Sequence, residues 1–106
     1  MSQPVPTRYE QELERLSKLP RAERFEELVQ FPTQHTFKVI GRSEGFSLAV
    51  EGLLRTSGHP EVLLIERPSS GGKYVSVTFT LGVESGAALD ELYRALEQLP
   101  GLAYLW

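Results

Sequence analysis

The segment Ser69-Ser70-Gly71-Gly72-Lys73 comes nearest to a motif that could do chemistry, because it has the composition of a phosphate-binding loop. It lacks the Gly-x-x-x-x-Gly-Lys-Ser/Thr spacing. It also joins two predicted strands, so no helix start follows to supply aligned amides. A hairpin turn explains its serines and glycines. Backbone amides beside Lys73 and Arg67 could still hold a small anion, so Ser69, Ser70, Gly72 and Lys73 are candidate ligand-binding residues.

The two histidines add no catalytic or metal-binding pattern. His35 lies in a predicted strand and His59 in a Gly-His-Pro turn, and neither has a second ligand at His-x-x-x-His spacing. A catalytic set requires a nucleophile, a base and a group that orients the base. The absence of cysteine excludes disulfides, thiol catalysis and zinc sites built on thiolates. We expect a protein that is not an enzyme and that uses no metal and no cofactor.

Composition and charge limit the partners. The chain has 106 residues, the size of one domain, and a net charge of −3 from 11 basic and 14 acidic residues. Binding to a phosphate backbone usually needs a basic surplus, so no nucleic-acid partner is expected. The first residues have neither a charged n-region nor an apolar h-region, and no apolar run is long enough for a membrane helix. A cytoplasmic protein without a membrane partner is expected.

Residues 1–30 are predicted to form a helical extension. The spacing of Tyr9, Leu13 and Leu16 predicts a helix over residues 8–19, with Thr7 as its N-cap. Pro20 should end that helix, and a second one fits residues 21–29. The apolar stripe of this extension has three possible positions: on its own domain, on a partner protein or on a second copy of the chain.

A strand, a helix and a second strand are predicted to follow. Residues 33–40 are rich in β-branched and aromatic side chains, which favours a strand. Ser43 is the expected N-cap of a helix whose apolar stripe begins at Phe46, and a close helix–sheet contact would explain Gly52 inside it. Four consecutive apolar residues predict that the strand over 61–67 is buried on both faces or covered at its edge.

The strand over residues 74–83 has the clearest pattern in the chain. Five apolar side chains alternate with hydroxyl-bearing ones, which predicts that one face is buried. The buried set is expected to be Val75, Val77, Phe79, Leu81 and Val83. A helix from Ser85 and a short strand over 102–106 should complete the chain.

This order of elements predicts an α+β fold, the ferredoxin-like βαββαβ two-layer sandwich, over residues 31–106. Right-handed crossovers place the first and third strands in the centre and the second and fourth at the edges, with two helices covering one face. The apolar second strand at an edge is a liability unless it is covered, which predicts a homodimer.

Two motif blocks resemble the YbeD-like family of small bacterial proteins over residues 27–106. The blocks are Phe31-Pro32-Thr33, Phe37-Lys38-Val39 and Gly41, followed by Pro68-Ser69-Ser70, Gly72, Tyr74 and Ser76-Val77. The resemblance implies an ACT-like fold, akin to regulatory domains that bind amino acids, and a gene-context link to lipoate metabolism. It also implies that Gly41, Arg42 and Ser43 line an effector site at a dimer interface. A helix N-cap beside a surface arginine is the alternative for these three residues.

We therefore expect a non-catalytic regulatory or adaptor module that binds a protein partner or a small metabolite. The alternative is a sensor of an amino or carboxylic acid, held near Arg42 or Lys73. RNA binding on the open sheet is the less favoured alternative, because Tyr74 is the only clear aromatic on that face of the third strand and the chain is acidic.

Overall fold

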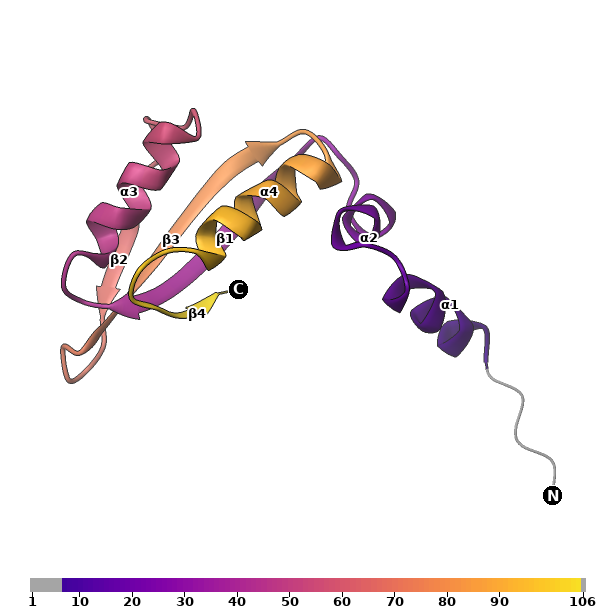
Figure 1. Cartoon of the computed structure of the whole chain (residues 1–106), viewed down its shortest axis with the longest axis horizontal. Helices are drawn as coiled ribbons and strands as arrows, with labels where there is room; N and C mark the ends of the chain where they lie inside the picture. Colours follow the sequence, from indigo (N-terminus) through magenta and orange to yellow (C-terminus); the bar gives the residue numbers. More distant parts are fainter. Residues whose placement is uncertain (1–6, 106) are drawn as a thin grey trace, which may run out of the picture.

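The computed structural model describes residues 7–105 and contains four helices and four strands within that range (Figure 1). In chain order these are α1 (Arg8–Ser17), α2 (Arg21–Leu28), β1 (Thr33–Arg42), α3 (Phe46–Thr56), β2 (Ile65–Pro68), β3 (Tyr74–Val83), α4 (Gly86–Glu97) and β4 (Leu102–Leu105). No helix in the described range is both long enough and apolar enough to cross a bilayer. The last residue of the predicted final strand, Trp106, lies outside the described residues.

The four strands form one antiparallel sheet in the order β2-β3-β1-β4. The two long strands β1 and β3 pair in the centre over ten residues each, with Phe37 opposite Phe79. The short strands β2 and β4 lie at the edges. This confirms the predicted ferredoxin-like arrangement, in which β1 and β3 are central.

The core lies between one face of the sheet and the helices α3 and α4. All five predicted β3 side chains are buried, namely Val75, Val77, Phe79, Leu81 and Val83. They pack in one cluster with Phe37 and with Phe46 of α3 and Leu89 of α4. The rings of Phe37 and Phe79 stack with their centroids 5.2 Å apart. Period-2 alternation therefore identified the buried face correctly.

The prediction for the second strand was wrong in extent and in burial. The observed β2 begins at Ile65, and it pairs with β3 only as far as Pro68. Leu63 is 78% exposed and Ile65 is 56% exposed, whereas Val62 and Leu64 pack against the core. Only one face of the sheet is covered by helices, so alternate side chains of this apolar run face solvent. Gly52 was also explained wrongly, because no atom beyond its chain neighbours and the backbone of its own helix lies within 4 Å of the position that its Cβ would occupy.

The helices α1 and α2 differ in how they meet the domain. Thr7 caps α1 as predicted, its Oγ1 accepting a hydrogen bond from the Glu10 amide at 3.1 Å, but α1 buries no residue. In contrast, α2 packs against α4. The Phe25 and Tyr93 rings stack 5.7 Å apart, and a Cβ on Gly86 would lie 2.3 Å from the Ala22 carbonyl oxygen. The extension thus packs on its own domain through α2 alone.

Polar contacts strengthen the junction of α2 and α4. The Gly86 amide donates to Glu26 Oε1 at 2.6 Å, and Arg21 pairs with Asp90 and Glu97. The largely buried Asp90 carboxylate also accepts from Arg94 at 2.9 Å. The hydrogen bond from Arg21 is the main cause that holds the pKa of Asp90 below its ordinary value.

This lowered pKa predicts an acid-sensitive contribution to stability. Because the folded state favours the charged carboxylate, the contribution of Asp90 is present above the ordinary carboxyl pKa of about 3.9 and is lost as the pH falls below it. We expect Asp90→Asn to be less stable than the natural chain at pH 7, as measured by urea unfolding, and the difference to shrink towards pH 3. A difference that stays constant between these pH values would contradict the role given to the Asp90 charge.

Candidate ligand site at the end of β1

The two loops singled out in the sequence meet at one corner of the sheet. Ser43, directly after β1, connects them: its Oγ donates to the Gly72 carbonyl at 2.6 Å and lies 3.1 Å from the Lys73 carbonyl. Its backbone amide donates to the same Lys73 carbonyl at 3.1 Å. Segments about thirty positions apart in the chain are thereby fixed side by side.

Ser43 does not cap α3, so that prediction was wrong. The N-cap is Gly45, whose φ of 73° lies in the left-handed region that glycine favours. Gly45 has no side chain, so the first turn of α3 carries no side-chain cap. The backbone amides of the first turn of α3 therefore keep the partial positive charge of a helix start. The Ser43 hydroxyl is used instead to join the two loops.

A third segment, the turn between α4 and β4, completes the corner. The Arg42 amide donates to the Gly101 carbonyl at 3.0 Å, next to a register shift between β1 and β4 after Ile40. The three segments enclose an open cavity of about 540 Å³. It is lined by Arg42, Ser43, Glu44, Gly45, Ala49, Lys73, Pro100 and Gly101.

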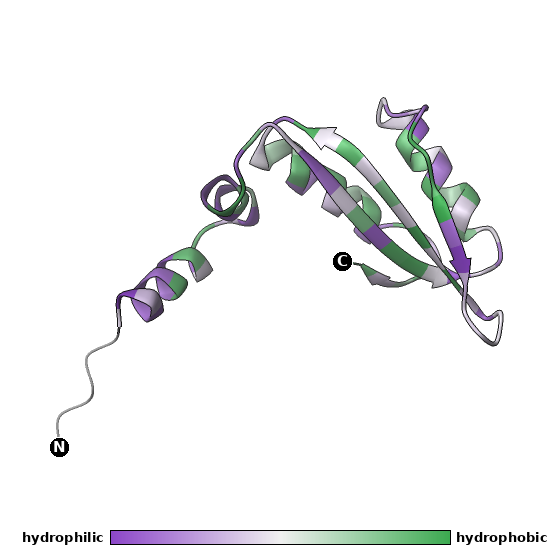
Figure 2. Ribbon diagram, turned by 180° about the vertical axis from the view of Figure 1, so that it is seen from behind, coloured by the Kyte–Doolittle hydropathy of each residue, from purple (hydrophilic) through white to green (hydrophobic). Residues whose placement is uncertain are grey.

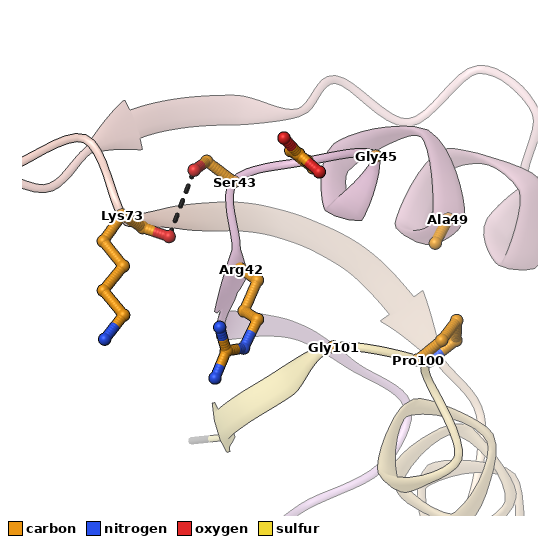
Figure 3. Close-up of a pocket in the computed structure, with 8 residues that line it drawn as sticks. Arg42, Ser43, Gly45, Ala49, Lys73, Pro100 and Gly101 are labelled. Atoms are coloured by element: carbon orange, nitrogen blue, oxygen red, sulfur yellow. Dashed lines mark hydrogen bonds between the residues drawn. The ribbon is translucent and has the colours of Figure 1, made fainter.

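The cavity has cations on its rim. Figure 3 shows the Arg42 and Lys73 side chains extending in the same direction from the two joined segments. Neither takes part in an ion pair within residues 7–105, although Lys73 Nζ lies 5.6 Å from the centroid of the Tyr74 ring. Glu44 supplies a carboxylate to the same lining. The cavity therefore offers charged groups of both signs together with the uncapped start of α3.

The seven predicted site residues divide by role. Arg42, Ser43 and Lys73 line the cavity. Gly72 contributes the carbonyl that Ser43 binds, and its φ of 72° makes the turn possible. The remaining three residues, Gly41, Ser69 and Ser70, are not part of the cavity lining.

Structural roles explain two of these three residues. Gly41 is buried, and a Cβ atom there would lie 2.2 Å from Cδ1 of Phe46. Ser69 closes the hairpin, because its Oγ accepts from the Tyr74 amide at 3.1 Å and its amide donates to the Tyr74 carbonyl at 2.8 Å. Ser70 is an exposed turn residue.

Sequence reasoning missed five lining residues: Glu44, Gly45, Ala49, Pro100 and Gly101. Nothing in the local pattern of Pro100-Gly101 indicates contact with a strand almost sixty positions away. Only the pairing of β4 with β1 reveals this contact.

The histidines lie elsewhere and have different surroundings. His35 Nε2 lies 3.0 Å from the Tyr93 hydroxyl oxygen, and burial lowers the pKa of His35. His59 lines a separate cavity of about 430 Å³ that also includes Glu84 and Glu91. Within the described part of the chain, no three His, Cys, Asp or Glu side chains are placed to hold one metal ion.

Comparison with known proteins supplies the family context. The family model described as "Protein of unknown function (DUF493)" matches residues 26–105. A UPF0250 protein of Idiomarina loihiensis is 35% identical over 83 residues, covering 77% of this chain and 94% of that protein. A UPF0250 protein of Bordetella pertussis is 36% identical over 78 residues, covering 71% of this chain and 86% of that protein. The solution structure of protein HP0495 from Helicobacter pylori has a TM-score of 0.63 at 21% identity, covering 85% of this chain and 90% of that one.

Proposed function

Since the chain belongs to the DUF493 family of small bacterial proteins, as its YbeD-like motifs predicted, we propose that it is a non-catalytic regulatory module that binds a small amino or carboxylic acid. One observation carries this proposal. Ser43 joins two loops so that Arg42 and Lys73 extend from the same cavity rim, beside the uncapped first turn of α3. Two cations and free helix amides are suited to a carboxylate.

The mixed charge of the lining favours an amino acid among small acids. The ligand carboxylate would pair with the guanidinium of Arg42 and the ammonium of Lys73, while Glu44 would accept a hydrogen bond from the ligand ammonium. The volume of about 540 Å³ is within the usual range for small-ligand sites. Ser43 would act as a positioning residue, because its hydroxyl proton already binds a backbone carbonyl.

An adaptor that binds a protein partner is the second candidate, and the uncovered face of the sheet supports it. In either role we propose action in the cytoplasm as a homodimer. The gene-context link to lipoate metabolism remains an implication of the family resemblance.

A thermal-shift screen of amino and carboxylic acids tests the proposed ligand. A ligand at 100 times its dissociation constant stabilises the folded state by about 2.7 kcal/mol, so a clear rise in Tm is expected for the right acid. Arg42→Gln and Lys73→Gln should each abolish the rise. Arg55→Gln is the matched control, because this exposed cation of α3 does not line the cavity and should leave the rise intact.

Two results would overturn the proposal. One is a screen in which no acid raises Tm in the natural chain. The other is measurable turnover of a substrate that disappears when a single polar residue is replaced, because a non-catalytic module has no such residue.

A further inference from the structure

The helix α1 has an apolar stripe that its own domain leaves uncovered. Tyr9 is 73% exposed and Leu13 is 49% exposed, and no residue of α1 is buried. Figure 1 shows α1 extending away from the sheet and from α3 and α4. A helix of ten residues is marginal in water without tertiary packing. This helix therefore needs a surface on which to pack.

The sheet has an uncovered face that, like the stripe of α1, carries exposed apolar side chains. Its open face, the one opposite α3 and α4, is formed by alternate residues of all four strands, and no helix of the described part of the chain lies over it in Figure 2. The apolar members are Ile40, Ile65, Tyr74 and Tyr104, and the charged members are Lys38, Arg42 and Arg67. The uncharged polar members are Gln34, Thr36, Ser76, Thr78 and Thr80.

The large apolar side chains of the open face lie on both sides of the central hydroxyl-bearing part of β3. The strand register places Ile40 between Tyr104 and Ser76, and Ile65 beside Thr78. Ile65 is 56% exposed and Tyr104 is 57% exposed. Large apolar side chains grouped in this way on a surface mark a contact site.

Charge and size also fit α1 to the open face. At about 100° per residue, Glu12, which pairs with Arg15 at 2.9 Å, is the charged residue of α1 nearest to the stripe. Lys18, which follows α1, lies on the opposite side. Among residues 7–105 the open face carries no carboxylate, and Arg67 takes part in no ion pair there. Four strands span roughly 14 Å at their usual spacing, close to the roughly 15 Å length of a ten-residue helix.

The helix α1 cannot reach the open face of its own sheet. It is joined to α2 by residues 18–20, and three residues span at most about 10 Å. Because α2 is fixed to α4 by Arg21, Glu26 and Phe25, its start stays on the helix-covered side of the sheet. The helix also precedes the family match, which begins at residue 26, so it is an addition to the shared domain.

We propose that the apolar stripe of α1 docks on the open face of a second copy of the chain. The exchange is reciprocal, so each copy gives one helix and receives one, and the contacts close into a two-fold dimer. Tyr9 and Leu13 pack against Ile40, Ile65 and Tyr104 of the other copy. Arg42 is the one open-face residue that also lines the cavity, but none of the residues that pack against α1 lines it, so the inference does not depend on the proposed ligand.

The test is the mass of the full chain in solution, measured by light scattering after size-exclusion chromatography. The natural chain is expected at twice its 11.9 kDa. Leu13→Glu and Ile65→Glu should each halve that mass. Two controls add the same charge elsewhere and should remain dimeric: Gln11→Glu, on the opposite side of α1, and Leu48→Glu, an exposed apolar position on α3.

Mixing the two monomeric variants makes the test specific for exchange. The Leu13→Glu chain keeps an intact open face and the Ile65→Glu chain keeps an intact stripe, so the mixture should regain a dimer through one contact. A chain that carries both substitutions has neither an intact stripe nor an intact open face, so it should stay monomeric. Unchanged circular dichroism spectra would show that the variants are folded, since both positions are exposed.

Several outcomes would overturn the inference. They are a natural chain that is monomeric at all concentrations, a dimer that persists in both variants, and a mixture that stays monomeric. A monomer whose open face instead binds RNA or a foreign acidic peptide, with binding lost in Ile65→Glu, would assign the face to that other partner.

Discussion

Gly41→Ala is expected to lower the free energy of unfolding by about 3 kcal/mol, because it forces a methyl group into a filled core. The added Cβ would lie 2.2 Å from Cδ1, 2.4 Å from Cε1 and 2.4 Å from Cγ of Phe46. Phe46 is almost completely buried, so its ring cannot move aside without displacing other core side chains. A loss of this size is a large fraction of the roughly 5–15 kcal/mol that stabilises a typical domain.

Gly52→Ala is the matched control for this substitution. Gly52 lies inside α3, and no atom beyond its chain neighbours and the backbone of its own helix is within 4 Å of the position of its Cβ. Alanine favours a helix over glycine by up to about 1 kcal/mol, so this substitution should stabilise the protein. Urea unfolding of the two variants measures both effects. Equal behaviour of the two variants would contradict the packing role of Gly41.

Phe37→Ala is expected to cost about 3–5 kcal/mol, because Phe37 lies at the centre of the core. Its ring is fully buried and stacks on Phe79 at 5.2 Å. It also contacts the rings of His35 and Tyr93, with centroid separations of 4.6 and 5.1 Å. Its loss leaves a cavity between β1, β3 and α4 that these neighbours can fill only in part. Calorimetry should therefore show a large fall in Tm.

Thr36→Ala is the control for the loss of the Phe37 ring. Thr36 is the preceding residue of β1, and its side chain lies on the open face, with Oγ1 2.8 Å from Oγ1 of Thr80. An exposed neutral hydrogen bond of this kind contributes about 1 kcal/mol. If Thr36→Ala destabilised the protein as much as Phe37→Ala, the core assignment would be wrong.

The contrast between Gly41 and Ser43 shows how a correct location can have an incorrect explanation. The family resemblance assigned both residues to an effector site. The structure assigns Gly41 to the packing of Phe46, and it assigns Ser43 to the junction of two loops. A glycine that is required because an aromatic ring packs against it cannot be distinguished in a sequence from one that is required because a ligand binds there. Glycine has no side chain whose chemistry would separate the two roles.

Local pattern alone determined much of the domain. The alternation from Val75 to Val83 identified the buried face of β3, and the order of elements placed β1 and β3 in the centre of the sheet. Thr7 caps α1 as predicted, and α4 begins directly after Ser85, where the last helix was predicted to start. The alternation and the cap depend on the geometry of single elements, in which neighbours along the chain supply most of the interactions. The strand order follows from the right-handed connections between consecutive elements.

Tertiary structure decided the start of β2, the cap of α3 and the composition of the cavity. β2 starts where β3 provides a pairing partner, not where the apolar run begins. Gly45 caps α3 because Ser43 is bound to the hairpin, and Gly101 reaches Arg42 because β4 returns beside β1. Each of these contacts joins residues from separate elements. Their positions follow from how the elements pack together, which no local pattern contains.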